Sequence, residues 1–95
     1  MSDQVIRIID KIRPVLVRHG VNKAELFGSA ARDEMDGKSD VDVLVELPRS
    51  STLFEVVRLR RDLMGLLKRE VDVVTYGALS SRLAPFILND AIKII

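Results

Sequence analysis

The sequence predicts a small α/β domain in which helices pack against a single β-sheet. Apolar residues recur at helical spacing near the start and again in the middle of the chain, and three short runs have the length and character of strands. The elements follow the order helix, strand, helix, strand, helix, strand, helix, which is typical of layered helix and sheet. We therefore expect one sheet of three or more strands, covered by helices.

The composition fits a single domain over residues 1–95. Apolar residues make up 47% of the chain and aromatic residues only 4%, so the core must consist mainly of Val, Ile and Leu. The 15 Lys and Arg residues against 14 Asp and Glu give a net charge of +1, which argues against generic nucleic-acid binding. The absence of cysteine excludes disulfides, thiolate zinc sites and cysteine nucleophiles.

The sequence shows no signal for a membrane. No apolar run approaches the length of a membrane span, and the N-terminus lacks the basic and apolar layout of a signal peptide. We therefore expect a cytoplasmic protein.

The first helix is predicted from apolar residues at steps of three and four. These residues are Val5, Ile8, Ile9, Ile12, Val15 and Leu16. Ser2 or Asp3 can cap the start of the helix, and Gly20 ends it. Because Pro14 removes a backbone donor and clashes with the preceding turn, we expect a kink or two shorter helices there.

The next segment predicts two strands with a short helix between them. Residues 24–27 form a short strand, residues 30–35 one or two helical turns, and residues 36–38 a polar turn. Residues 40–46 predict the clearest strand, because every second residue is a valine.

The second half predicts a helix, a strand and a final helix. The helix covers residues 53–68, and the strand covers residues 71–75, which are rich in β-branched residues. A last helix is expected from Ser80, with Pro85 in its first turns, whereas residues 91–95 fit either helix or strand. The side chains expected to point inward from the helix over 53–68 are Val56, Val57, Leu63, Met64 and Leu67. Those expected on its solvated side are Arg58, Arg60, Arg61 and Asp62.

The helix over 53–68 carries more apolar residues than one narrow stripe requires. The simpler explanation is that these residues belong to the core. The alternative is that part of this surface, or the tail over 87–95, is covered by another chain.

Three aspartates mark the expected catalytic and metal-binding site. Asp40 and Asp42 are two residues apart in a strand, so their carboxylates point to the same face. Adjacent anions raise each other's pKa unless a cation lies between them, and Mg²⁺ prefers oxygen ligands. Asp72 joins the cluster if the strand over 71–75 lies beside the strand over 40–46. A plain turn or cap role would explain Asp40 and Asp72, but it explains Asp42 poorly because that carboxylate interrupts a strand.

Gly28 and Ser29 lie between a predicted strand and a predicted helix. A glycine there allows a ligand to approach the backbone, and the free N–H groups of a helix N-terminus suit phosphate. Ser29 adds a hydroxyl donor. Taken alone, this dipeptide is better explained by a simple turn.

Gly28-Ser29, ten further residues and Asp40-Val41-Asp42 resemble the signature of the DNA polymerase β-like nucleotidyltransferase superfamily. The chain resembles the minimal nucleotidyltransferase (MNT) branch, whose members are short proteins often encoded beside a HEPN-domain protein as a toxin–antitoxin pair. The matching runs are Leu26-Phe27-Gly28-Ser29-Ala30-Ala31-Arg32 and Ser39-Asp40-Val41-Asp42-Val43-Leu44-Val45. The resemblance covers essentially the whole chain and implies a small nucleotidyltransferase fold with a mixed sheet. One departure is Asp33, where many members carry glycine.

The resemblance implies a metal-dependent transfer of a nucleoside monophosphate, AMP from ATP, to a hydroxyl acceptor with release of pyrophosphate. It makes Asp40 and Asp42 ligands of two Mg²⁺ ions, while Asp72 completes one metal site and accepts the proton of the acceptor. It makes Gly28 and Ser29 the residues that hold the outer phosphates.

Arg32 has two interpretations. It either adds positive charge near the phosphates or forms a surface pair with Glu34 or Asp36.

The resemblance also implies a partner. The favoured function is an adenylyltransferase that modifies a side chain of a partner HEPN toxin and thereby acts as an antitoxin. The alternative is a non-catalytic antitoxin that neutralises its partner by occlusion. A homo-oligomer is compatible with either function.

Overall fold

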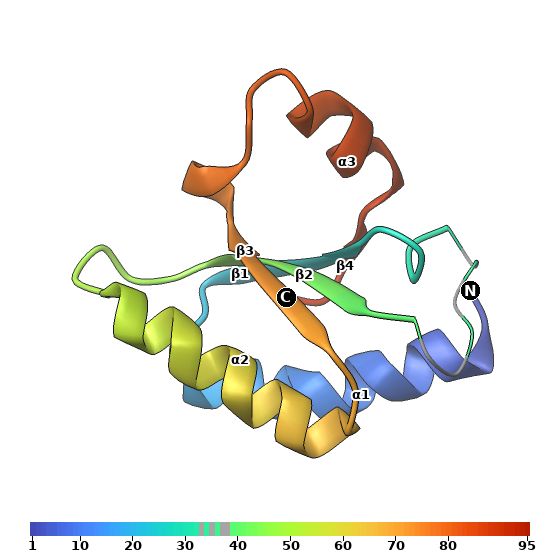
Figure 1. The fold of residues 1–95 in the computed structure, drawn as a ribbon, viewed down its shortest axis with the longest axis horizontal. Coiled ribbons are helices and arrows are strands. Elements are labelled where there is room, and N and C mark those ends of the chain that lie inside the picture. The colour runs from blue at the N-terminus through green and yellow to red at the C-terminus, as the bar shows by residue number, and fades with distance from the viewer. Residues whose placement is uncertain (33, 35, 37–38) are drawn as a thin grey trace.

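A computed structural model describes residues 1–32, 34, 36 and 39–95, and it consists of a four-stranded sheet with helices on both faces. The two long helices, α1 (Asp3–Arg18) and α2 (Leu53–Leu67), lie side by side on one face. The short helix α3 (Ala84–Asp90) lies over the other face (Figure 1). The structure confirms the predicted α/β fold class.

The sheet is mixed and has the strand order β3-β2-β1-β4. β1 (Lys23–Phe27) pairs antiparallel with both β2 (Val41–Glu46) and β4 (Ile92–Lys93). β2 pairs parallel with β3 (Val71–Thr75), and α2 forms the crossover that a parallel pair requires. Of the two alternatives for residues 91–95, the structure therefore selects a strand.

α1 is one continuous helix, so the expected division at Pro14 is wrong. Its N-cap is Ser2, whose hydroxyl accepts a hydrogen bond from the backbone N–H of Val5 at 3.2 Å. Pro14 lies on the exposed side of the helix, and packing on the opposite side holds the helix together across the missing donor. All six residues of the predicted apolar stripe are buried on that opposite side: Val5, Ile8, Ile9, Ile12, Val15 and Leu16.

α2 begins with a capping box between Thr52 and Glu55, in which the backbone N–H of Thr52 donates to Glu55 Oε2 at 2.6 Å. Its buried residues are Leu59 and Leu63. The expected inward position of Val57 is wrong, because its side chain is 46% exposed. At 100° per residue, Val57 lies nearly opposite to the buried Leu59.

The short helix expected over residues 30–35 is not found in the described part of that segment. Residues 28–32 form turns, in which the N–H of Arg32 donates to the carbonyl of Gly28 at 3.2 Å. Residues 33, 35, 37 and 38 lie outside the described residues, and they include two of the three positions of the predicted polar turn.

The C-terminal part differs in its boundaries from the expected helix. A 3₁₀ turn (Tyr76–Ala78) follows β3, and α3 begins at Ala84, four residues after the expected start, with Pro85 in its first turn.

The core lies between the sheet and the two long helices. The valines of β2 at positions 41, 43 and 45 are buried against these helices, as the alternating pattern predicts. Among the described residues, no helix combines the length and the apolar character needed to cross a membrane.

Candidate active site

Three segments meet at one end of the sheet. Because β1 is antiparallel to β2 and β2 is parallel to β3, the end of β1 and the starts of β2 and β3 lie at the same end of the sheet, with β2 in the middle (Figure 1). The register pairs Phe27 of β1 with Asp42, and Asp42 with Asp72 of β3. The turn that begins at Gly28 therefore lies beside Asp42, which in turn lies beside Asp72. The sequence-based condition for Asp72, that its strand lies next to β2, is met.

Asp42 and Asp72 form a pair of adjacent carboxyl groups that share a side-chain hydrogen bond. Partial burial, the charge of Asp72, the hydrogen bond with Asp72 and the charge of Asp40 together raise the pKa of Asp42 to about 6, with burial the largest cause. The pair therefore holds a proton more readily than two separate aspartates, and a cation that approached it would displace that proton.

Gly28 lies directly against Asp42 of this pair. Its φ is +70°, in the left-handed region that favours glycine. A Cβ atom at this position would lie 2.2 Å from Oδ2 of Asp42, closer than any real contact allows. The sequence predicts a glycine here because a ligand approaches the backbone. The structure adds a second reason for glycine at this position: the Asp42 carboxylate occupies the space that a side chain of residue 28 would need.

Asp40 is exposed and lies one residue before β2 begins at Val41. Its charge is nevertheless near enough to raise the pKa of Asp42. All three predicted aspartates are therefore at this end of the sheet, with Asp42 the least accessible of them.

Ser29 and Arg32 belong to the turn after β1. Ser29 is half-buried beside Gly28. Arg32 is exposed, and its Nε donates to Glu34 Oε2 at 3.3 Å, which is one of the two interpretations given for it. Its charge also lowers the pKa of Asp42, against the stronger effects that raise it. The surface pair and an electrostatic link to the aspartates are thus both present.

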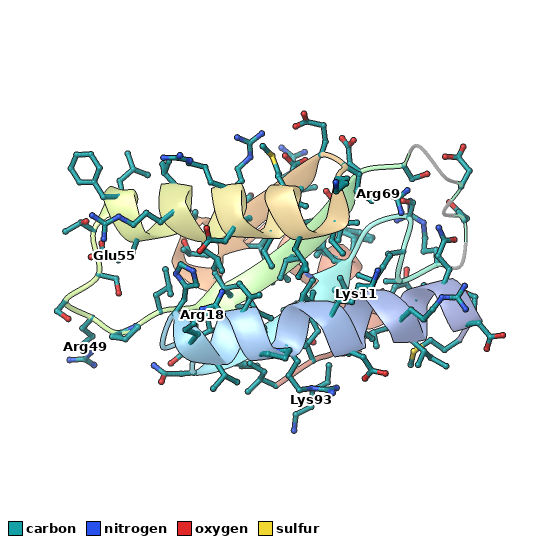
Figure 2. All side chains as sticks on the ribbon, turned by 90° about the horizontal axis from the view of Figure 1, so that it is seen from below. Lys11, Arg18, Arg49, Glu55, Arg69 and Lys93 are labelled. Carbon is teal, nitrogen blue, oxygen red and sulfur yellow. The ribbon has the colours of Figure 1, made fainter. Side chains whose placement is uncertain are left out.

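Arg69 is a residue at this site that sequence reasoning missed. Its guanidinium group donates to the backbone carbonyl of Asp36 at 2.6 Å, and Figure 2 shows the labelled arginine just beyond the end of α2. Ser39 Oγ donates to Asp36 Oδ1 at 3.1 Å. These contacts hold Asp36 and Ser39, which precede Asp40 in the chain. No local pattern indicates them, because 33 residues separate Arg69 from its acceptor.

The donor set suits a hard divalent cation. In the part of the chain that the structure describes, no three acidic or histidine side chains are already gathered in the geometry of a metal site. The raised pKa of Asp42 nevertheless shows that its carboxylate lies in the field of Asp72 and Asp40. Carboxylate oxygens are the ligands that Mg²⁺ prefers, and a cation relieves the repulsion that raises this pKa. The residues present therefore fit such an ion.

The sequence matches the family model described as "Nucleotidyltransferase domain" over residues 9–94. It is 44% identical over 85 residues to a candidate protein adenylyltransferase of Methanocaldococcus jannaschii, covering 90% of this chain and 91% of that protein. It is 34% identical over 77 residues to the protein adenylyltransferase MntA of Thermococcus cleftensis, covering 81% of this chain and 78% of that protein.

Solved structures show the same fold. A candidate minimal nucleotidyltransferase superposes with a TM-score of 0.82 at 35% sequence identity, covering 97% of this chain and 95% of that one. A chain from the complex of the tri-AMPylated HEPN toxin of Shewanella oneidensis with its MNT antitoxin has a TM-score of 0.75 at 19% identity, covering 96% of this chain and 71% of that one. The second likeness concerns the fold alone. The family model covers most of the chain, and the predicted aspartates lie together at one end of the sheet. This chain therefore belongs to the nucleotidyltransferase domain family and groups with its minimal nucleotidyltransferases.

Proposed function

We propose that this chain transfers AMP from ATP to a hydroxyl group on a partner protein, that a HEPN-domain toxin is this partner, and that the chain thereby acts as an antitoxin. The observation that carries the proposal is the Asp42–Asp72 carboxyl pair packed against the backbone of Gly28. Two further facts support it. A relative that is 34% identical is named a protein adenylyltransferase, and the fold occurs in a complex with a tri-AMPylated HEPN toxin.

Each residue of the site has a role in this reaction. Gly28 and Ser29 would hold the outer phosphates through backbone N–H groups and the Ser29 hydroxyl, because glycine lets the phosphates approach the backbone closely. Asp40, Asp42 and Asp72 would hold Mg²⁺. When bound, the metal neutralises charge on the triphosphate, and phosphoryl-type transfer depends mainly on such neutralisation and on positioning.

The transfer itself needs one proton acceptor. The acceptor oxygen forms a bond to the α-phosphorus of ATP, the bond from that phosphorus to the bridging oxygen of the β-phosphate breaks, and pyrophosphate leaves. The hydroxyl proton passes to the carboxylate of Asp72. Asp72 suits this role better than Asp42, because Asp72 is exposed whereas Asp42 is half-buried between its neighbours.

The first test is transfer of label from ATP to a purified HEPN-domain protein from the same organism. With Mg²⁺ present, ATP labelled in the α-phosphate should label that protein, whereas ATP labelled in the γ-phosphate should not. Asp42→Asn should reduce the labelling rate by at least about 100-fold, because it removes charge at the reacting phosphate. Asp10→Asn removes a carboxylate from the exposed side of α1 and should label the partner at the normal rate.

The same experiment separates catalysis from occlusion. If Asp42→Asn still neutralises the toxin while transfer is lost, the non-catalytic antitoxin is the correct function. If wild-type protein transfers no AMP although it binds ATP, the adenylyltransferase proposal is wrong.

A further inference from the structure

The outer face of α2 is the side turned away from the core, and it consists of Phe54, Val57, Arg58, Arg61 and Gly65. These residues follow the spacing i, i+3, i+4, i+7 and i+11, so they share one side of the helix. All five are exposed, and Phe54 is 74% exposed although it is among the largest apolar side chains of the chain. Figure 2 shows α2 lying beside α1, with side chains projecting outward along its length. Nothing in the fold accounts for an aromatic ring there.

The outer face of α2 belongs to a segment that carries a surplus of positive charge. Residues 48–62 contain four arginines and two acidic residues, a surplus of two charges in a chain whose total is +1. Both acidic residues are already engaged. Glu55 accepts hydrogen bonds from Thr52 in the capping box, and Asp62 Oδ2 lies 2.7 Å from His19 Nε2.

The surplus is concentrated on the outer face. Arg60 is directed toward the sheet, where its guanidinium group donates to the carbonyl of Val71 at 2.9 Å and to Glu70 Oε2 at 3.1 Å. Within the described residues, Arg58 and Arg61 form no ion pair. The outer face therefore presents two available guanidinium groups next to Phe54.

Gly65 gives the outer face a flat end. A Cβ atom at this position would meet nothing within 4 Å, so the fold itself does not require glycine. Glycine inside a helix is less stable than alanine by roughly 0.5–1 kcal/mol. A glycine with no internal reason suits a surface that another backbone approaches closely.

An apolar cavity adjoins the start of the helix. Its volume is about 410 Å³, and its lining includes Leu47, Pro48, Leu53 and Val56. It lies at the far end of β2 from Asp42, because the lining also includes Glu46, four residues further along the strand and thus about 13 Å away. A molecule held here would leave the aspartates accessible.

We propose that the outer face of α2 binds an acidic amphipathic helix of the partner protein. Apolar side chains of that helix would cover Phe54 and Val57, and its carboxylates would pair with Arg58 and Arg61. A phosphate backbone would match the arginines but not the apolar side chains. A two-fold contact between two copies would bring like charges together. The identity of the partner, and only that, rests on the proposed function.

The test measures binding of the full chain to a purified HEPN-domain protein from the same organism, by titration calorimetry. Phe54→Ser and the double variant Arg58→Glu/Arg61→Glu should each weaken binding at least about 10-fold, as for central interface residues. Lys11→Glu, on the exposed side of α1, is the matched charge control and should change Kd less than about twofold. Circular dichroism checks that each variant is folded, and Gly65→Ala supplies a variant that should bind more weakly although its helix is strengthened.

This inference would be overturned by wild-type affinity for the HEPN-domain protein in all the outer-face variants, or by no binding of the wild-type chain to that protein. Self-association of the chain that Phe54→Ser abolishes would overturn it as well. Binding of an RNA oligonucleotide that depends on the arginines but not on Phe54 would also overturn it. The transfer assay keeps the two proposals apart. If AMP is transferred at the normal rate by outer-face variants that bind normally, the function stands and the docking surface does not. If those variants bind weakly and the wild-type chain transfers no AMP, the docking surface stands and the function does not.

Discussion

The carboxyl group of Asp42 is held in an environment that opposes its ionisation. Burial, as the largest cause, and the neighbouring Asp72 and Asp40 together raise its pKa to about 6. The folded protein therefore binds a proton here more tightly than the unfolded chain, whose aspartate has a pKa near 3.8. Below about pH 4 the carboxyl group is protonated in both states and does not change the free energy of unfolding. As the pH rises from about 4 through 6, the unfolded chain loses this proton first, so the free energy of unfolding falls.

Replacing Asp42 by asparagine should remove that cost. We expect Asp42→Asn to be more stable than wild type by about 1–2 kcal/mol at pH 8, after allowing for solvent screening of a half-buried group. The difference should vanish near pH 4, where the aspartate is also neutral. Urea unfolding at both pH values, without divalent ions, measures it. Adding Mg²⁺ should stabilise the wild type and not the variant, and equal stabilisation of both would remove Asp42 from the metal ligands.

Gly28 gives a second prediction at the same site. We expect Gly28→Ala to lower the free energy of unfolding by about 1–3 kcal/mol, because alanine at positive φ is strained and its methyl group would overlap the Asp42 carboxylate. ATP binding should be lost with it. Gly77→Ala is the matched control, because its Cβ would meet nothing within 4 Å, and this variant should unfold nearly as wild type does. A Gly28→Ala protein of normal stability would contradict the close packing described here.

Among the helices, α1 tolerates Pro14 in its interior because Pro14 lies on the exposed side and the opposite side of the helix is buried. We expect Pro14→Ala to raise the free energy of unfolding by about 1–3 kcal/mol, since it restores a backbone hydrogen bond and removes a clash. Thermal unfolding followed by circular dichroism measures the gain. Lys11→Ala, an exchange at an exposed position already occupied by a good helix former, should change little. An unchanged or lower stability of Pro14→Ala would mean that the proline ring packs against the fold.

The helices and strands with a strong periodic pattern could be predicted from the sequence. The alternating valines of β2 and the apolar stripe of α1 appear in the structure as expected, because burial on one face imposes its period on the sequence. Local pattern failed where tertiary packing decides. Pro14 did not divide α1, and Val57 faces outward because Leu59 and Leu63 define the buried side of α2.

For the molecule as a whole, the sequence indicated the members of the site but not their arrangement. The spacing of Gly28 and Asp42 predicted that both matter, yet only the antiparallel register shows that the glycine makes room for the carboxylate. The contact of Arg69 with Asp36 depends on the path of a loop that no periodic pattern describes. Pairings between distant segments are set when the sheet assembles, so they cannot be obtained from neighbours along the chain.

The parallel pairing of β2 with β3 has a consequence for biosynthesis. Asp42 and Asp72 are brought together by a crossover that includes all of α2, so the site has no local precursor. A nascent chain that already displays Gly28 and Asp42 still lacks the strand that completes the cluster. The aspartate cluster therefore forms only after residues 71–75 have been made and β3 has paired with β2, so a complete site indicates that these distant segments have folded together.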